Sequence, residues 1–321
     1  MIHQVWTIAR STFTEALRQP IYLVLLLATL VLIGVNPAFS AFTLGEDEKL
    51  LVEIGLSTIF VGGLLLAAFT ATRVIAEEIR HHTVLSVVAK PVSRAGFLIG
   101  KFIGVTAALG VACWIWSAGF LMAVRHGVLA TALDRAHLPV IWLGLAALAT
   151  ATAVATWRNY RSGTVFSSCL TYWLAVLAPT ACAISHLFDE RWGLVSFGAQ
   201  WNPQHLMALA LIAEALAVLS AIAVAASTRL GQAMTLILCS LVFLLGLTSE
   251  YLLGRFAESS LLGRGAYALV PNLQLLWLGE ALAIEQPVSL SYVALATCYC
   301  GAYCVAVLAL GTALFQTRDV G

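Results

Sequence analysis

Long apolar stretches, separated by short polar connections, run through almost the whole chain. A helix needs about 20 mostly apolar residues to cross a hydrocarbon core of about 30 Å. Stretches of this length predict an all-α fold: a polytopic integral membrane helix bundle with about eight transmembrane helices. Asn36 and Pro37 interrupt the first stretch near its end. The predicted spans are residues 21–40, 54–76, 96–124, 138–156, 164–187, 205–226, 233–253 and 290–315.

Residues 1–20 have a different pattern, in which apolar and charged positions lie on different helix faces. Apolar residues recur at helical spacing from Val5 to Leu17, whereas the arginines and the glutamate between them face elsewhere. Such a helix lies in the headgroup plane rather than across the bilayer. We therefore expect an interfacial helix over 1–20, or else a frayed tail, with Pro20 turning the chain into a transmembrane domain over 21–321.

The connection 254–289 is too apolar for a solvated loop. Leucines, a tyrosine and Trp277 predict one or two short helices that lie at the outer interface or re-enter the bilayer. Backbone at that depth is tolerated only where protein covers it or where it lines a cavity. The segment is therefore either a lid or gate at the external mouth or a purely structural brace.

Composition excludes other classes of protein. Apolar residues make up 61% of the 321 positions and charged residues only 10%, against about 25% in soluble domains. The net charge of +1 excludes a basic nucleic-acid binder, so no nucleic acid is expected among the partners. The expected surroundings of the chain are the lipid bilayer.

The distribution of Lys and Arg predicts the orientation. With the N-terminus in the cytoplasm, eight spans place eleven Lys and Arg residues inside and six outside, in agreement with the positive-inside rule. Both termini are then cytoplasmic, and the expected location is the inner (plasma) membrane of the cell, as a multi-pass protein. Charged residues precede the first apolar run, so no cleavable signal peptide is expected.

Residues 73–94 join the second and third predicted spans on the cytoplasmic side. Two acids and then basic residues lead a short apolar run, in which Leu85 and Val88 share one face. A helix over 77–92 of this kind is too short and too charged to cross the bilayer. It offers a hydrophobic knob with a charged rim to a soluble partner.

Three segments resemble the permease subunits of ABC-2 type transporters. In residues 73–94, an acid and a base precede Thr83, an apolar pair and Pro-Val-Ser-Arg at 91–94, and Gly100-Lys101 follows in the next span. The amphipathic start at 8–18 is similar to the interfacial elbow helix of that family. The ending Phe-Gln-Thr-Arg-Asp at 315–319 is similar to its closing Phe-x-Arg-Arg-Asp.

The resemblance implies a membrane subunit of an ATP-driven transporter, in particular an exporter. The segment 77–92 would be the coupling helix that docks into a separate ATPase subunit, and two permeases would pair as a homodimer or heterodimer. Most members have six spans, which implies that the pair of spans near 205–253 is an elaboration. His82 and Thr317 depart from the family pattern. The residues implied in ATPase coupling are Glu77, Glu78, Arg80, Thr83, Leu85, Val88, Pro91 and Arg94.

Motifs of catalysis are missing from the sequence. The run Gly96-Phe-Leu-Ile-Gly-Lys101 is one residue too short for a phosphate-binding loop and lacks the Ser or Thr after the lysine. Neither His-Glu-x-x-His nor Gly-x-Ser-x-Gly occurs. We therefore expect no enzyme activity in this chain and no cofactor, with ATP hydrolysis in a separate subunit.

Glu214 is predicted to lie in the middle of a span, where a charge costs about 2.5–3.5 kcal/mol on insertion scales. It either contributes to a substrate, proton or cation path or makes an interhelical hydrogen bond. A path role would suit the alternative function, an ion- or proton-coupled secondary transporter.

Seven cysteines all lie in apolar stretches, which argues against a secreted disulfide framework. Cys298, Cys300 and Cys304 cluster near the C-terminus, and the last two share a helix face. Soft thiolates suit Cu(I), although small buried residues are the simpler interpretation.

Overall fold

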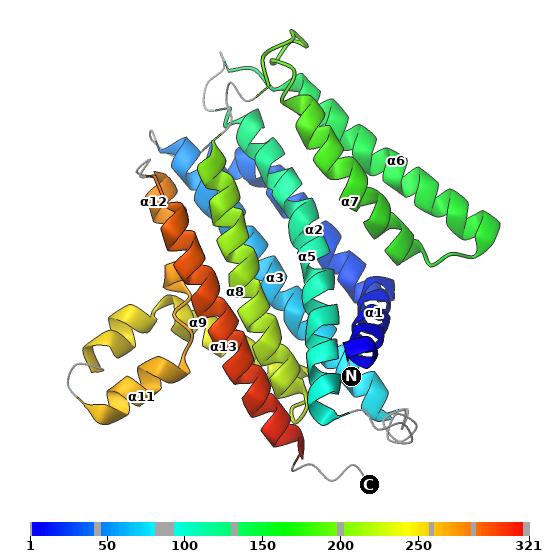
Figure 1. Cartoon of the computed structure of the whole chain (residues 1–321). Helices are drawn as coiled ribbons and strands as arrows, with labels where there is room; N and C mark the ends of the chain where they lie inside the picture. The colour runs from blue at the N-terminus through cyan, green and yellow to red at the C-terminus, as the bar shows by residue number, and fades with distance from the viewer. Residues whose placement is uncertain are drawn as a thin grey trace.

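The computed structural model describes residues 2–41, 46–80, 93–129, 134–197, 202–256, 260–283 and 287–316. In these ranges the regular structure is helical, apart from one isolated antiparallel bridge between Phe188 and Leu194. Long helices run side by side along most of the molecule (Figure 1). The predicted all-α polytopic membrane bundle is confirmed, and its helices pair their interior backbone groups within one segment, as the bilayer requires.

Seven helices in the described residues are long and apolar enough to cross a membrane. Pro20 opens the first of them, and Pro37 is accommodated within it, where Asn36 Nδ2 donates to the Leu51 carbonyl oxygen of the next helix (2.7 Å). The seven helices are α2 (Pro20–Ser40), α3 (Asp47–Arg80), α5 (Arg94–His126), α6 (Leu138–Ser162), α7 (Phe166–Ser185), α8 (Pro203–Ser227) and α13 (Leu290–Gln316).

The predicted span 233–253 is not one continuous helix. α9 (Gln232–Leu247) has 16 residues, about 24 Å in length, which is shorter than the hydrocarbon core. The Leu273 amide donates to the Gly246 carbonyl oxygen (3.0 Å), and the chain continues as the π-helix η1 (Glu250–Gly254). A contact with the distant connection therefore ends this helix, and the apolar pattern of the sequence does not reveal it.

The rest of this connection contains short helices. The described part of 254–289 includes α11 (Leu261–Leu269), the 3₁₀ turn η2 (Gln274–Leu276) and α12 (Gly279–Ala283). In Figure 1, α8 runs down to the end of the bundle near α1, and α13 begins again near the opposite end. α9 and the connection after it thus return the chain from one end of the bundle to the other as several short segments, where the sequence predicts the single span 233–253.

For orientation, the end of the bundle with α1 (Ile2–Arg18), the start of α5 and the end of α13 is called the lower end, as in Figure 1. The start of α3 and the end of α5 lie at the upper end.

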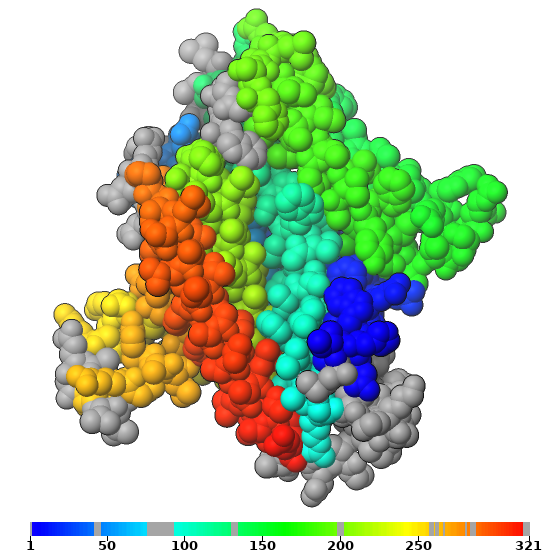
Figure 2. Space-filling view, in the orientation of Figure 1, coloured from blue at the N-terminus to red at the C-terminus, as the bar shows by residue number. Residues whose placement is uncertain are grey.

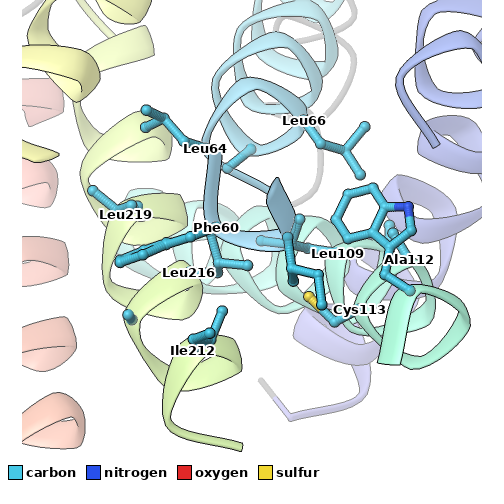
Figure 3. Close-up of a cluster of buried hydrophobic side chains, with 14 of the residues drawn as sticks. Phe60, Leu64, Leu66, Leu109, Ala112, Cys113, Ile212, Leu216 and Leu219 are labelled. Atoms are coloured by element: carbon cyan, nitrogen blue, oxygen red, sulfur yellow. The ribbon is translucent and has the colours of Figure 1, made fainter. Parts of the chain in front are cut away.

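The core lies where α3, α5 and α8 meet. Figure 3 shows Phe60 and Leu64 of α3 facing Leu216 and Leu219 of α8, beside Leu109 of α5. Lipid tails are as apolar as these side chains, so close packing rather than removal from water holds such helices together. A Cβ at Gly63 would overlap the Leu216 side chain, so the glycine allows this close approach.

Buried polar contacts tie α2 and α8 to the central helix α5. The Tyr22 hydroxyl donates to the Ala108 carbonyl oxygen (2.8 Å), and Trp116 Nε1 donates to the Leu26 carbonyl oxygen (3.0 Å). The Thr106 and Ser220 hydroxyls are 2.8 Å apart. Each contact satisfies a group that would be costly to leave unpaired inside the bundle.

α6 and α7 form a hairpin that projects from the side of the bundle (Figures 1 and 2). Ala147, Ala151 and Ala155, spaced by four, are buried, whereas most other residues of α6 are exposed. In the most apolar 18 residues of α8, by contrast, 72% are buried, against 28% in α6. α8 is therefore central to the bundle, whereas α6 and α7 lie at its side.

Candidate functional site

The residues predicted for ATPase coupling lie at or beyond the lower end of α3. The backbone of Glu77, Glu78 and Arg80 belongs to the last turn of this helix. Thr83, Leu85, Val88 and Pro91 lie outside the described residues. The prediction for 77–92 therefore bears on a segment whose two flanking helices, α3 and α5, are both central to the bundle.

Arg94, the last predicted coupling residue, caps the end of α13. Its Nη1 donates to the carbonyl oxygens of Phe315 (2.8 Å) and Gln316 (2.7 Å), and its guanidinium carbon lies 5.6 Å from the centroid of the Phe315 ring. Phe97 stacks on the same ring, at 5.9 Å between centroids. The last carbonyls of a helix lack partners within it and carry partial negative charge, so a cation binds there favourably.

A second arginine reaches the same helix end. Arg229, in the turn between α8 and α9, donates through Nε to the Leu314 carbonyl oxygen (3.0 Å). The lower end of α13 is thus held by cations from two connections. Nothing in the local sequence around Leu314 reveals these contacts, because the partners are far apart in the chain.

α1 packs directly on the first turns of α5. The glycines at 100 and 104 make this possible, because a Cβ at Gly104 would lie 2.6 Å from the Ala9 carbonyl oxygen and one at Gly100 would lie 3.0 Å from that of Val5. Ser93 caps α5 by accepting a hydrogen bond from the Gly96 amide (3.1 Å). The run that mimics a phosphate-binding loop is therefore a glycine face for helix packing.

Glu214 lies between α8 and α13, half-buried. Its Oε1 accepts a hydrogen bond from the Thr297 hydroxyl (2.6 Å), and Oε2 is buried without a partner in the described structure. Cys300, one turn further along α13, also faces the carboxylate. The structure thus contains the interhelical hydrogen bond that the sequence analysis named as one of two roles.

An apolar pocket of about 450 Å³ lies between α3, α9 and η2. Phe60 is its central ring: it meets Phe243 edge-on at 4.8 Å and stacks on Trp277 at 6.1 Å between centroids. Ser57 and Gln274 add the polar groups of its lining. Aromatic walls with a few polar groups are typical of small-molecule sites, and the sequence analysis missed this pocket because its rings come from three distant segments.

Tyrosines of α13 attach the connection between α9 and α13 to the bundle. The Tyr299 hydroxyl accepts from the Asn272 amide (2.8 Å), and the Tyr303 hydroxyl donates to the Leu269 carbonyl oxygen (2.7 Å). Glu250 of η1 accepts hydrogen bonds from Tyr267 (2.8 Å) and from Asn272 Nδ2 (3.1 Å). The bond to Glu250 raises the pKa of Tyr267.

A polar cavity of about 950 Å³ opens at the upper end of the bundle. Four histidines line it, at positions 126, 137, 186 and 205, and none of them was singled out from the sequence. A faint signal was available, since each lies at the end of an apolar stretch.

The three C-terminal cysteines do not form a metal centre. Cys300 is buried and Cys304 half-buried on one face of α13, whereas Cys298 is exposed. Across the part of the chain that the structure describes, no group of three or more His, Cys, Asp or Glu side chains is arranged to hold a metal ion.

No protein-family model matches the chain, and no curated protein matches it either.

Proposed function

We propose that this multi-pass membrane protein is the permease subunit of an ATP-driven transporter of the ABC-2 type, and that it exports its substrate. Its partner is a separate ATPase subunit that grips residues 77–92 from the cytoplasm. Two permeases form the pathway, with the lower end of each bundle in the cytoplasm.

The proposal rests on contacts between segments that are far apart in the sequence. The three stretches that resemble the family are separated by up to about nine tenths of the chain, yet all reach the first turns of α5. α1 packs on Gly100 and Gly104, the Pro-Val-Ser-Arg run ends in Arg94 at the start of the helix, and Phe315 lies against Arg94 and Phe97. We call these contacts around the first turns of α5 the lower joint. The lower joint supports a coupling role, because it links the segment that an ATPase would move to the rest of the bundle.

The same contacts suggest how movement would spread. A push on 77–92 acts directly on α3, which contains Phe60, and on α5. Arg94 connects α5 to α13, and the tyrosines of α13 connect that helix to the segment that ends at Trp277. Phe60 and Trp277 face each other in the apolar pocket. Rigid helices would therefore transmit a cytoplasmic displacement to both sides of this pocket, as in other shear movements.

The decisive experiment is co-purification of the ATPase with the permease variant Leu85→Asp. A charge in the knob should abolish association, because a buried apolar contact would become a desolvated carboxylate. Leu194→Asp is the matched control, since Leu194 is exposed at the upper end and should leave association unchanged. Equal recovery of the ATPase with both variants would contradict the docking role.

The alternative is an ion- or proton-coupled secondary transporter that uses Glu214. The buried Oε2 favours this candidate, because a carboxylate inside the bundle can take up a proton or a cation. Purified wild-type protein in liposomes would then transport along an ion gradient without any ATPase, and Glu214→Gln would stop it. Transport that requires ATP and the ATPase, and that survives Glu214→Gln, would exclude this alternative.

A further inference from the structure

The polar cavity at the upper end is separate from the apolar pocket and from the lower joint. It is enclosed by the start of α3, the end of α5, and the connections that lead into α6 and from α7 to α8. All these boundaries are ends of membrane spans, so the cavity lies at the level of lipid headgroups, which belong to the outer leaflet in the proposed orientation. None of its residues takes part in the proposed ATPase coupling.

The wall of the cavity is built by a folded connection. Arg125 donates through Nε to the Ser185 carbonyl oxygen (3.1 Å) and through Nη2 to that of Phe188 (2.7 Å). Asp189 accepts hydrogen bonds from the amides of Arg191 (2.9 Å) and Gly193 (2.6 Å). These hydrogen bonds stabilise the part of the loop from Ser185 to Gly193 and anchor it to the end of α5.

His137 is the residue that points to a ligand. Its side chain is only 4% exposed and lines the cavity, and its Nδ1 has no hydrogen-bond partner in the described structure. A buried polar atom without a partner is costly unless another group satisfies it. Glu190 lies close enough to interact electrostatically with the His137 ring.

The charge of the lining selects the ligand. Three arginines oppose five carboxylates, which leaves a net charge of −2 while the histidines are neutral. The carboxylates belong to Asp47, Glu48, Asp134, Asp189 and Glu190. A cation is therefore favoured, but the volume of about 950 Å³ greatly exceeds that of a bare ion, and no metal-binding group is found among the described side chains.

We propose that this cavity binds a ligand with a primary or secondary ammonium group, which donates to His137 and pairs with Glu190. The ammonium group comes either from the ethanolamine headgroup of an outer-leaflet phospholipid or from a soluble amine. Both sources offer N–H donors together with a positive charge, as the neutral imidazole and the carboxylates require.

The binding should weaken on acidification. Burial, followed by the neighbouring Arg125, lowers the pKa of His137, while Glu190 opposes this and His126 adds to it. The neutral ring therefore persists to a lower pH than in an ordinary histidine. Once charged, it would repel an ammonium group and could no longer accept its hydrogen bond.

The test uses the full-length protein in nanodiscs of pure phosphatidylcholine, whose quaternary ammonium has no N–H. Spermidine is titrated calorimetrically into wild type, Glu190→Gln, His137→Phe and the charge control Glu46→Gln, which lies outside the cavity. We expect the Kd of both cavity variants to rise about tenfold and that of the control to stay unchanged. Thermal unfolding of each variant in parallel separates loss of binding from loss of fold.

A second arm distinguishes the two sources. The same proteins are placed in nanodiscs that contain phosphatidylethanolamine, and the retained lipid is identified by native mass spectrometry. A lipid ligand is retained by wild type and by Glu46→Gln, is lost from the two cavity variants and competes with spermidine; a soluble ligand leaves spermidine binding unaffected. The proposal is overturned if binding of neither spermidine nor phosphatidylethanolamine depends on Glu190 and His137.

This outcome does not depend on the ATPase. Loss of association in Leu85→Asp and loss of amine binding in Glu190→Gln are separate results, so either proposal can fail alone.

Discussion

The two ends of α5 are built in opposite ways. At the lower end, glycines bring the α1 backbone against the helix, Ser93 caps its first turn and Arg94 reaches the last carbonyls of α13. At the upper end, the helix finishes at His126 beside a polar cavity of about 950 Å³. A region without free space transmits displacement, whereas a region with a preformed cavity can receive a ligand, so one helix connects a joint to a site.

The largest effect is expected when one methyl group is added to α5 at the lower end. In Gly104→Ala the new Cβ would lie 2.6 Å from the Ala9 carbonyl oxygen and would force α1 away. We expect a loss of about 1–3 kcal/mol in the free energy of unfolding, measured as a lower Tm in detergent. Gly110→Ala on the same helix is the control, because no atom lies within 4 Å of its Cβ position. Equal Tm values would show that the joint is not tightly packed.

Removing the arginine of the joint should affect coupling more than stability. Arg94→Ala leaves the Phe315 and Gln316 carbonyl oxygens without this cation, and Arg94→Lys keeps the charge but loses the planar guanidinium. A coupling free energy of about 1–3 kcal/mol corresponds to about 5–150-fold, so we expect ATP-driven transport to fall by about tenfold in Arg94→Ala while the ATPase still co-purifies. Unchanged transport in Arg94→Ala would show that Arg94 takes no part in coupling.

The smallest effect is expected at the upper end, as a dependence of stability on pH. Burial is the main cause that lowers the pKa of both His137 and His186 below the ordinary value of 6.5. The folded protein then binds fewer protons than the unfolded chain, so stability is complete above pH 6.5 and is lost as the pH falls through the lowered pKa values. Tm should therefore decrease between pH 7.5 and 5, and the decrease should be smaller in His137→Phe. If Tm depended on pH in the same way in His137→Phe and in wild type, His137 would not be a source of the pH dependence.

The connection between α9 and α13 shows which features the local sequence pattern predicts and which depend on tertiary contacts. Its apolar leucines correctly indicated short helices rather than a solvated loop. The premature end of α9 at Leu247 could not be predicted, because it depends on the amide of Leu273, which donates to Gly246. Hydrogen bonds between residues so far apart leave no periodic trace in the sequence.

Glu214 and the histidines illustrate the same limit for the sites. A carboxylate within an apolar run is conspicuous, so Glu214 was found, but its partner Thr297 is 83 positions away. The sequence does not distinguish His137 and His205, since a single histidine at the end of a span is common. Only the fold brings the four rings and the five carboxylates around one cavity.

The long apolar helices and the amphipathic start follow from the amino-acid sequence, because length and helical periodicity are properties of neighbouring residues. The number of spans does not, since the sequence predicts about eight and the described residues contain seven. Which helices form the core was decided by the folded chain alone. α6 and α8 are both apolar and rich in alanine, yet one lies at the edge and the other at the centre. Lipid and protein interior are equally apolar, so a sequence suited to one is equally suited to the other.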